Sequence, residues 1–404
     1  MRAQALVLFL ISWLFFTTLH PGKPLTVDSK VTLDTVRAMA RGGLAIPEEF
    51  VTRVGRDGKH YSLYGPLLPV VSLPGYFLGC LLDKDPPEPG EPRMGWGDRF
   101  ALATNQWVSA GIVTLLFLTA LEFGAGARAA LLLAGLSAVS TMIFPYSRDY
   151  FTQPLAALML LAAFHALLSF GRRERRRLLF ASSTAMGCAL LTRLDMAAAL
   201  PGLLWIGVAV QRCPRDGEGQ GGVKLAPLLG PMLACALALL LFDWVRWGGL
   251  FGAPYGTQRF DTPLIDSVPK LLFGADLSVF LYNPLLIASG IAMWFTWREK
   301  RHLWVGILLS ALAYLYIVAK YNDYHGGLCP GPRYLLSLVP LSLAPLGEAL
   351  AQRRPHRPYV FFGMVVLATP GILINGYSAV VDYTQAPAAW YFWVGKVAEI
   401  LSNR

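Results

Sequence analysis

The stretch that decides the fold runs from Thr26 to Pro66, beginning TVDSKVTLDTVRAMARGG and ending RDGKHYSLYGP. It lies between two apolar runs, Ala5–Leu19 and Leu67–Leu82. Such a charged loop is unusual in a chain that is 55% hydrophobic and only 15% charged. Polar loops held by a rigid apolar scaffold often carry binding and chemistry. We therefore expect the rest of the chain to form a frame that holds this loop against a bilayer.

Composition places the chain among multi-pass membrane proteins. The 404 residues have a mean hydropathy of +0.48, and apolar runs recur along the whole length. A bilayer core about 30 Å thick needs about 20 apolar residues in a helix, and unpaired backbone cannot face hydrocarbon. We predict an all-α polytopic membrane protein, with one integral membrane domain over residues 1–404 and membrane lipids around it.

The net charge of +10 is concentrated in short loops, which is a topology signal and not the pattern of a nucleic-acid-binding protein. Because cytoplasmic loops are rich in Lys and Arg, the most basic segments are placed in the cytoplasm: Arg172–Arg177, Arg212–Lys224, Arg298–His302 and Arg353–Arg357. This rule predicts about eleven transmembrane helices: Ala5–Leu19, Phe100–Leu121, Ala127–Pro145, Phe151–Phe170, Leu178–Arg193, Met196–Val210, Leu225–Phe242, Val279–Trp297, Leu303–Val318, Tyr334–Leu350 and Tyr359–Ile374.

With these orientations, residues 20–66 form the first external loop and residues 243–278 form the second large one. Both ends of the run 67–82 then lie outside, so we predict a juxtamembrane or re-entrant helix there. Its prolines support this interpretation, because proline disfavours a straight helix. The alternative is an ordinary span with one basic loop on the wrong side.

The external segments carry carboxylates that could do chemistry. Asp28 and Asp34 are six residues apart, so they do not share one face of a helix, and separate roles are expected. A carboxylate at a membrane surface can act as general base towards a hydroxyl. The alternative for either residue is capping of the following helix.

External cations accompany these acids: Lys59, Arg148, Arg193 and Arg333. One such cation alone is best explained by snorkelling or a local ion pair. Together, beside carboxylates, they suit a lipid phosphate, and arginine is well shaped to bind one. We assign contacts to the substrate to Tyr61, Tyr64 and His325, the last beside the tight turn GGLCPGPR.

These segments together resemble the bacterial GT-C glycosyltransferases, which use polyprenyl-phosphate sugars and are related to protein O-mannosyltransferases and aminoarabinose transferases. The resemblance starts in VDSKVTLDTVRAMARGG and GRDGKHYSLYGPLLPVVSLPGYFLG. It continues, in order, in PYSRDYFTQPLAALMLL (Pro145–Leu161), GGLFGAPYG with FLYNPLL (Gly248–Leu286) and YHGGLCPGPRYLLSLVPL (Tyr324–Leu341). It implies a GT-C-like fold with juxtamembrane helices in the first external loop.

The resemblance also implies roles. Asp28 would be the general base on the acceptor hydroxyl, and Asp149 would match a second acidic position of the family. Lys59, Arg193 and Arg333 would bind the departing lipid phosphate. Many relatives have an acidic pair in the first loop, whereas Asp28 is followed here by Ser29 and Lys30. No cofactor is therefore firmly implied, and a divalent metal stays open.

The function expected is an inverting glycosyltransferase at the outer face of a bacterial inner membrane. A polyprenyl-phosphate sugar would be the donor, and a lipid, glycan or protein hydroxyl would be the acceptor. The rival functions are a transporter or flippase of lipid-linked saccharides, which would need ionisable residues near mid-membrane, and a non-catalytic membrane scaffold. Strong charges map here to span ends and loops, which favours the enzyme.

Overall fold

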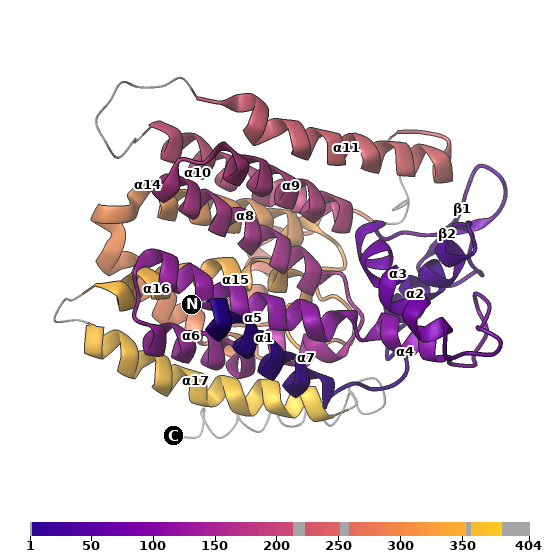
Figure 1. The fold of residues 1–404 in the computed structure, drawn as a ribbon, viewed down its shortest axis with the longest axis horizontal. Helices are drawn as coiled ribbons and strands as arrows, with labels where there is room; N and C mark the ends of the chain where they lie inside the picture. Colours follow the sequence, from indigo (N-terminus) through magenta and orange to yellow (C-terminus); the bar gives the residue numbers. More distant parts are fainter. Residues whose placement is uncertain (1, 213–222, 251–257, 353–356, 382–404) are drawn as a thin grey trace.

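The structure, a computed structural model, describes residues 2–212, 223–250, 258–352 and 357–381. It is a bundle of helices with a small assembly of short helices and a β-hairpin at one end (Figure 1). The bundle consists of α1 (Arg2–Thr17), α5 (Thr104–Phe123), α6 (Ala127–Ser140), α7 (Ile143–Arg148), α8 (Gln153–Arg173), α9 (Arg176–Thr192), η1 (Leu194–Ala199), α10 (Leu200–Arg212), α11 (Leu225–Trp247), α12 (Leu264–Phe273), α13 (Val279–Tyr282), α14 (Leu285–Lys320), η2 (Arg333–Leu338), α15 (Val339–Ser342), α16 (Ala344–Ala351) and α17 (Arg357–Val380).

The predicted all-α polytopic membrane fold is confirmed. Within the described residues, seven helical segments are long and apolar enough to cross a membrane. Shorter apolar helices accompany them, including α1 and α6. Residues 251–257, most of the basic segment 353–357, and the tail from 382 lie outside the described residues. The number of spans therefore stays a prediction.

One predicted loop is helical instead. The basic segment Arg298–His302 lies inside α14, where only Lys300 departs from helical geometry, with φ −125° and ψ 27°. The two predicted spans on either side are thus joined through a kink. Charge marks where a chain meets water, but it does not by itself end a helix, because lysine, arginine and glutamate are good helix formers.

Close helix crossings in the bundle depend on glycine. A Cβ atom at Gly202 of α10 would lie 2.0 Å from the carbonyl oxygen of Gly306 in α14. Small residues let backbones approach in this way, which matters in a membrane because association there depends on close packing. Ser310 donates a hydrogen bond of 2.6 Å to the carbonyl of Ala199 at the same crossing.

The small assembly at the end of the bundle contains α2 (Val27–Ala40), the antiparallel hairpin of β1 (Thr52–Val54) and β2 (His60–Ser62), α3 (Leu67–Cys80) and α4 (Trp96–Leu102) (Figure 1). The hairpin is a local exception to the all-helical prediction. The N-cap of α2 is Thr26, whose hydroxyl accepts a hydrogen bond from the backbone N–H of Ser29. Neither Asp28 nor Asp34 is therefore the cap of this helix. Gly42, with φ +77°, follows its end.

Helix α3 covers the predicted juxtamembrane segment. Its 14 residues rise about 21 Å, which is shorter than a bilayer core of about 30 Å. It packs against α2 and α4, beside the end of the bundle. We propose that it lies at the membrane surface.

Segments predicted to be external meet at this end. Arg56 of the hairpin donates its N–H to the carbonyl of Arg246, at the end of α11, with a length of 3.1 Å. Asn322 donates its N–H to the carbonyl of Arg259 at 2.8 Å. The glutamate–arginine contacts between Glu122 and Arg173 lie at the far end of α5 and α8.

Candidate active site

The centre of the candidate site is an ion pair between two residues that are far apart in the sequence, Asp28 and Arg333. Arg333 Nη1, at the start of η2, donates to Asp28 Oδ2, in the first turn of α2, at 2.7 Å. The side chains are 11% and 17% exposed, respectively. The pair is therefore mostly protected from water yet open to a ligand. Asp28 is also placed where the positive end of the helix dipole favours a carboxylate.

The loop before Arg333 shapes this arginine. A Cβ atom at Gly326 would lie 2.7 Å from Arg333 Cγ and 2.9 Å from its Nε, so only glycine lets the loop pass here. Gly326 also has φ +73°, which other residues rarely adopt. Within the described residues Arg333 Nε has no hydrogen-bond partner. Arg333 Nη2 donates to the Tyr334 hydroxyl at 3.2 Å.

Asp149 contacts α2 at the residue next to Asp28. Its Oδ1 accepts a hydrogen bond of 2.6 Å from the Ser29 hydroxyl and one of 2.8 Å from the N–H of Tyr150. Asn105 of α5 holds the same strand of backbone through the carbonyls of Asp149 and Phe151, at 2.6 and 2.8 Å. The structure therefore brings Asp28 and Asp149 to one place through adjacent residues of α2.

Two further groups surround the Asp28–Arg333 pair. Burial, together with the charge of Asp28 and a hydrogen bond to it, raises the pKa of the Tyr64 phenol well above its ordinary value. The phenol therefore stays protonated and can donate to Asp28. Burial also raises the pKa of Asp323, with Arg333 and His325 opposing this change. His325 is exposed and packs on Tyr324, with ring centroids 3.9 Å apart.

Arg193 is near this centre but already satisfied. It forms a two-pronged pair with Asp195, at 3.0 and 2.6 Å, and its third nitrogen donates to the Thr152 hydroxyl at 3.3 Å. Tyr314 donates to the same aspartate at 3.0 Å. The ring of Tyr334 has Arg193 at 5.2 Å and Arg333 at 5.0 Å. Arg193 thus supports the arginine that faces Asp28.

The other two predicted cations have different surroundings. Arg148 Nη1 donates to the carbonyls of Ala379 and Val381 at 2.7 and 3.0 Å, so it caps the end of α17. Lys59 is 67% exposed in the hairpin, 3.9 Å from Asp57. Tyr61 donates to Asp57 at 2.8 Å and packs edge-on against Trp247 of α11. In the described part of the chain, the contacts of Lys59 and Tyr61 therefore belong to the hairpin and not to the Asp28–Arg333 pair.

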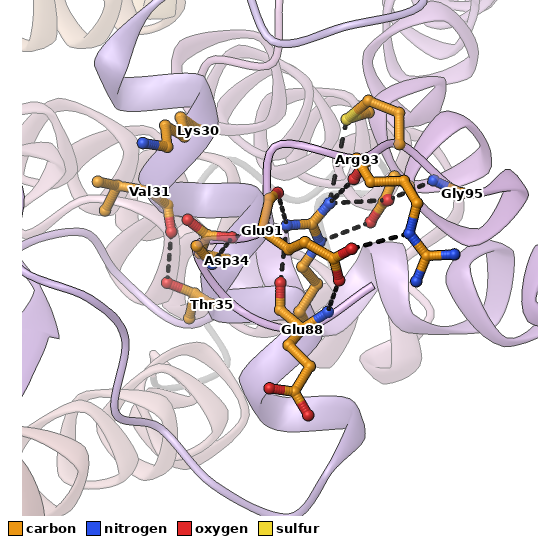
Figure 2. A network of polar contacts seen from close by, with 12 residues as sticks. Lys30, Val31, Asp34, Thr35, Glu88, Glu91, Arg93 and Gly95 are labelled. Atoms are coloured by element: carbon orange, nitrogen blue, oxygen red, sulfur yellow. Dashed lines mark hydrogen bonds and ion pairs between the residues drawn. The ribbon is translucent and has the colours of Figure 1, made fainter. Parts of the chain in front are cut away.

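Asp34 belongs to a second network, at the other end of α2 (Figure 2). It accepts hydrogen bonds from Arg37 at 3.1 Å and from the N–H of Gly90 at 2.9 Å. Arg37 also pairs with Asp98 through two bonds of 2.9 Å and donates to the carbonyls of Glu88, Glu91 and Arg93. This network fastens the loop between α3 and α4 to α2, so we propose a structural role for Asp34.

The carboxylates at the centre do not form a ready metal site. Asp28 is paired with Arg333, and Asp149 accepts from Ser29 and from backbone. No group of three or more His, Cys, Asp or Glu side chains gathers for a metal anywhere in the described ranges. A divalent metal therefore stays a prediction.

Three participants were given no role from the sequence: Ser29, Tyr334 and Asp195. Ser29 and Tyr334 are each next to a residue that was identified, so adjacency was the available signal. Asp195 follows Arg193 by two residues, a spacing that allows an ion pair at a helix end. The spacing cannot show that Arg193 is occupied by Asp195 and that Arg333 is the cation facing Asp28.

No protein-family model matches the chain, and no curated protein matches it significantly. Solved structures do. The structure of ArnT from Cupriavidus metallidurans bound to undecaprenyl phosphate matches with a TM-score of 0.60 and 17% identity, over 100% of this chain and 72% of that one. ArnT in the apo state gives a TM-score of 0.58 at 14% identity, with 96% and 76% covered.

The Archaeoglobus fulgidus oligosaccharyltransferase in complex with Zn and sulfate also matches. Its TM-score is 0.52 at 13% identity, over 92% of this chain. The present chain spans about half of that protein, 53% of its length. These matches show that the chain has the GT-C fold, as its sequence motifs predicted.

Proposed function

We propose that this protein is a glycosyltransferase that moves a sugar from a polyprenyl-phosphate-linked donor to an acceptor hydroxyl at the outer face of the membrane. The observation that carries the proposal is the Asp28–Arg333 pair, which joins residues 305 positions apart beside Asp149. A carboxylate and a cation at one partly open point can serve the two ends of such a transfer. The GT-C fold, and the lipid phosphate bound by ArnT, support the same chemistry.

In the proposed reaction, the oxygen of the acceptor hydroxyl bonds to the anomeric carbon of the sugar while Asp28 accepts the proton of that hydroxyl. The bond from that carbon to the phosphate oxygen breaks, and its electron pair leaves with the polyprenyl phosphate. Arg333 stabilises the charge that develops on this phosphate. A single displacement of this kind inverts the anomeric centre. General base catalysis by Asp28 would contribute roughly 10²–10⁴-fold.

The outer face is proposed from charge. Basic segments such as Arg172–Arg177 lie at the opposite end of the bundle from α2, and cytoplasmic loops are enriched in Lys and Arg. An active site on the outer face has no access to cytoplasmic nucleotide sugars, so a lipid-linked donor is required. A bacterial inner membrane is part of the same proposal, as the family resemblance implies.

The test uses the purified protein in nanodiscs with polyprenyl-phosphate-linked sugars and a panel of lipid, glycan and peptide acceptors. Mass spectrometry should detect sugar attached to an acceptor and free polyprenyl phosphate in equal amounts. Asp28→Asn should abolish both products. Movement of the intact lipid-linked saccharide across the bilayer, without cleavage of its phosphate bond, would instead establish a flippase.

A further inference from the structure

We propose that Asp28 and the donor phosphate compete for Arg333, so that binding of the donor is the event that frees Asp28 to act as base. The inference rests on the function proposed above and adds the order of events within the same site. It follows from which atoms of the two side chains are already engaged.

The carboxylate of Asp28, the proposed base, is already hydrogen-bonded in the free protein. Asp28 Oδ2 accepts a charge-assisted hydrogen bond of 2.7 Å from Arg333, and the charge of Asp28 contributes to the raised pKa of the nearby Tyr64 phenol. An acceptor hydroxyl that approaches Oδ2 would have to displace the guanidinium, and the ion pair holds the carboxylate towards Arg333. The free protein is therefore in a resting arrangement as far as the base is concerned.

Within the described residues, Asp28 is the carboxylate that holds the Arg333 guanidinium, through a single hydrogen bond. Its Nε lies under the backbone of Gly326, and its Nη2 donates to the Tyr334 hydroxyl. Its Nη1 holds Asp28 and has Cys329 Sγ at 3.7 Å. A phosphate oxygen that binds at Nη1 therefore takes the place that Asp28 occupies.

The exchange is balanced in charge. A sugar–phosphate–prenyl donor is a phosphodiester with one negative charge, the same charge that a carboxylate brings to Arg333. Asp28 is in the first turn of α2, where the Thr26 cap holds the backbone and the side chain can still turn. The expected sequence is donor first and acceptor second.

The alternative cation does not offer this exchange. Arg193 is held by both oxygens of Asp195 and by Thr152, so a phosphate would have to break a two-pronged pair. Two-pronged arginine–carboxylate pairs are among the stronger ones. The single bond between Arg333 and Asp28 is the easier one to replace.

The test measures binding of undecaprenyl phosphate to the purified protein at fixed ionic strength, with no acceptor present. Asp28→Asn should bind this probe about tenfold more tightly than the natural protein, because the competing charge-assisted bond is lost. Asp28→Ala should behave in the same way, which separates loss of competition from any bond made by the new amide. Arg333→Gln should bind the probe at least about tenfold more weakly than the natural protein.

Asp323→Asn is the matched control, because this carboxylate acts on Arg333 through its charge alone. It should change the affinity by less than about threefold, as a screened contact would. Equal tightening by Asp323→Asn and Asp28→Asn would overturn the competition in favour of general repulsion. Unchanged or weaker binding by both Asp28 variants would overturn it as well.

The two proposals fail differently. If Arg333→Gln weakens binding but the Asp28 variants do not tighten it, only the competition is wrong. If Arg333→Gln leaves binding of undecaprenyl phosphate unchanged, the phosphate does not bind at this arginine and the proposed active site is wrong. Thermal unfolding of each variant should match that of the natural protein, which shows that affinities are compared between folded molecules.

Discussion

The two ends of helix α2 carry the same pair of residue types with opposite consequences. At the C-terminal end, Arg37 is 2% exposed and every nitrogen of its guanidinium has a protein acceptor. At the N-terminal end, Arg333 makes one bond to a carboxylate that is 17% exposed, and its Nε has no partner within the described residues. A saturated, buried pair can only fasten the structure, whereas an unsaturated pair near the surface can exchange partners with a ligand.

The comparison is tested most strongly by removing one aspartate from each end of α2. Asp28→Asn should lower sugar transfer by roughly 10²–10⁴-fold, because the base is lost, without lowering the unfolding temperature. Asp34→Asn should keep its activity per folded molecule and lose about 1–3 kcal/mol of stability, because a buried bond to Arg37 is weakened. Transfer assays and thermal unfolding should be measured on the same preparations. Full activity of Asp28→Asn would reverse the assignment.

Removing the buried arginine should have the next largest effect. Arg37→Gln leaves the buried carboxylates Asp34 and Asp98 without their cation, and the expected loss in the free energy of unfolding is about 3–5 kcal/mol. Arg93→Gln, in the loop between α3 and α4, is the control. Its side chain is 50% exposed and pairs with Glu91 and Asp85, so the loss should stay below about 1 kcal/mol. Equal effects of the two substitutions, measured by denaturant unfolding in detergent, would contradict the fastening role of Arg37.

The two arginines beside Tyr334 can be separated by kinetics. Arg333→Gln should raise the KM for the lipid-linked donor by about 10–100-fold and lower kcat as well, because a charge-assisted contact to the phosphate is lost. Arg193→Gln should raise this KM only severalfold, since the residue supports Arg333 through Tyr334. A larger effect on KM from Arg193→Gln would make Arg193 the phosphate ligand, as the family resemblance implied.

The smallest expected effect is that of Tyr334→Phe. Tyr334→Phe keeps the ring between the two guanidinium groups and loses only the hydroxyl that accepts from Arg333, so the donor KM should rise about two- to fivefold. Tyr334→Leu also removes the cation–π contacts and should raise it about tenfold. Steady-state kinetics on both variants checks this order. A reversal, with Tyr334→Phe the more damaging, would show that the hydroxyl contacts the substrate.

Much of the architecture was predictable because its causes are local. An apolar run must become a helix in a membrane, since its backbone has no other hydrogen-bond partners there, and the fold class followed from this rule. The motifs around Asp28, Asp149 and Arg333 also pointed to the GT-C fold that the solved structures share. The kink at Lys300 was missed because a run of charges is compatible with a helix as well as with a loop.

The sequence by itself therefore determined which segments are apolar, which are charged, and which residue types could do chemistry. Only the tertiary structure decided which of them meet. Four candidate cations looked alike as isolated positions, yet one caps α17, one is exposed in the hairpin, one is paired with Asp195 and one faces Asp28. The physical reason is that an arginine's availability depends on its partners, and the partner of Arg333 is 305 residues away along the chain.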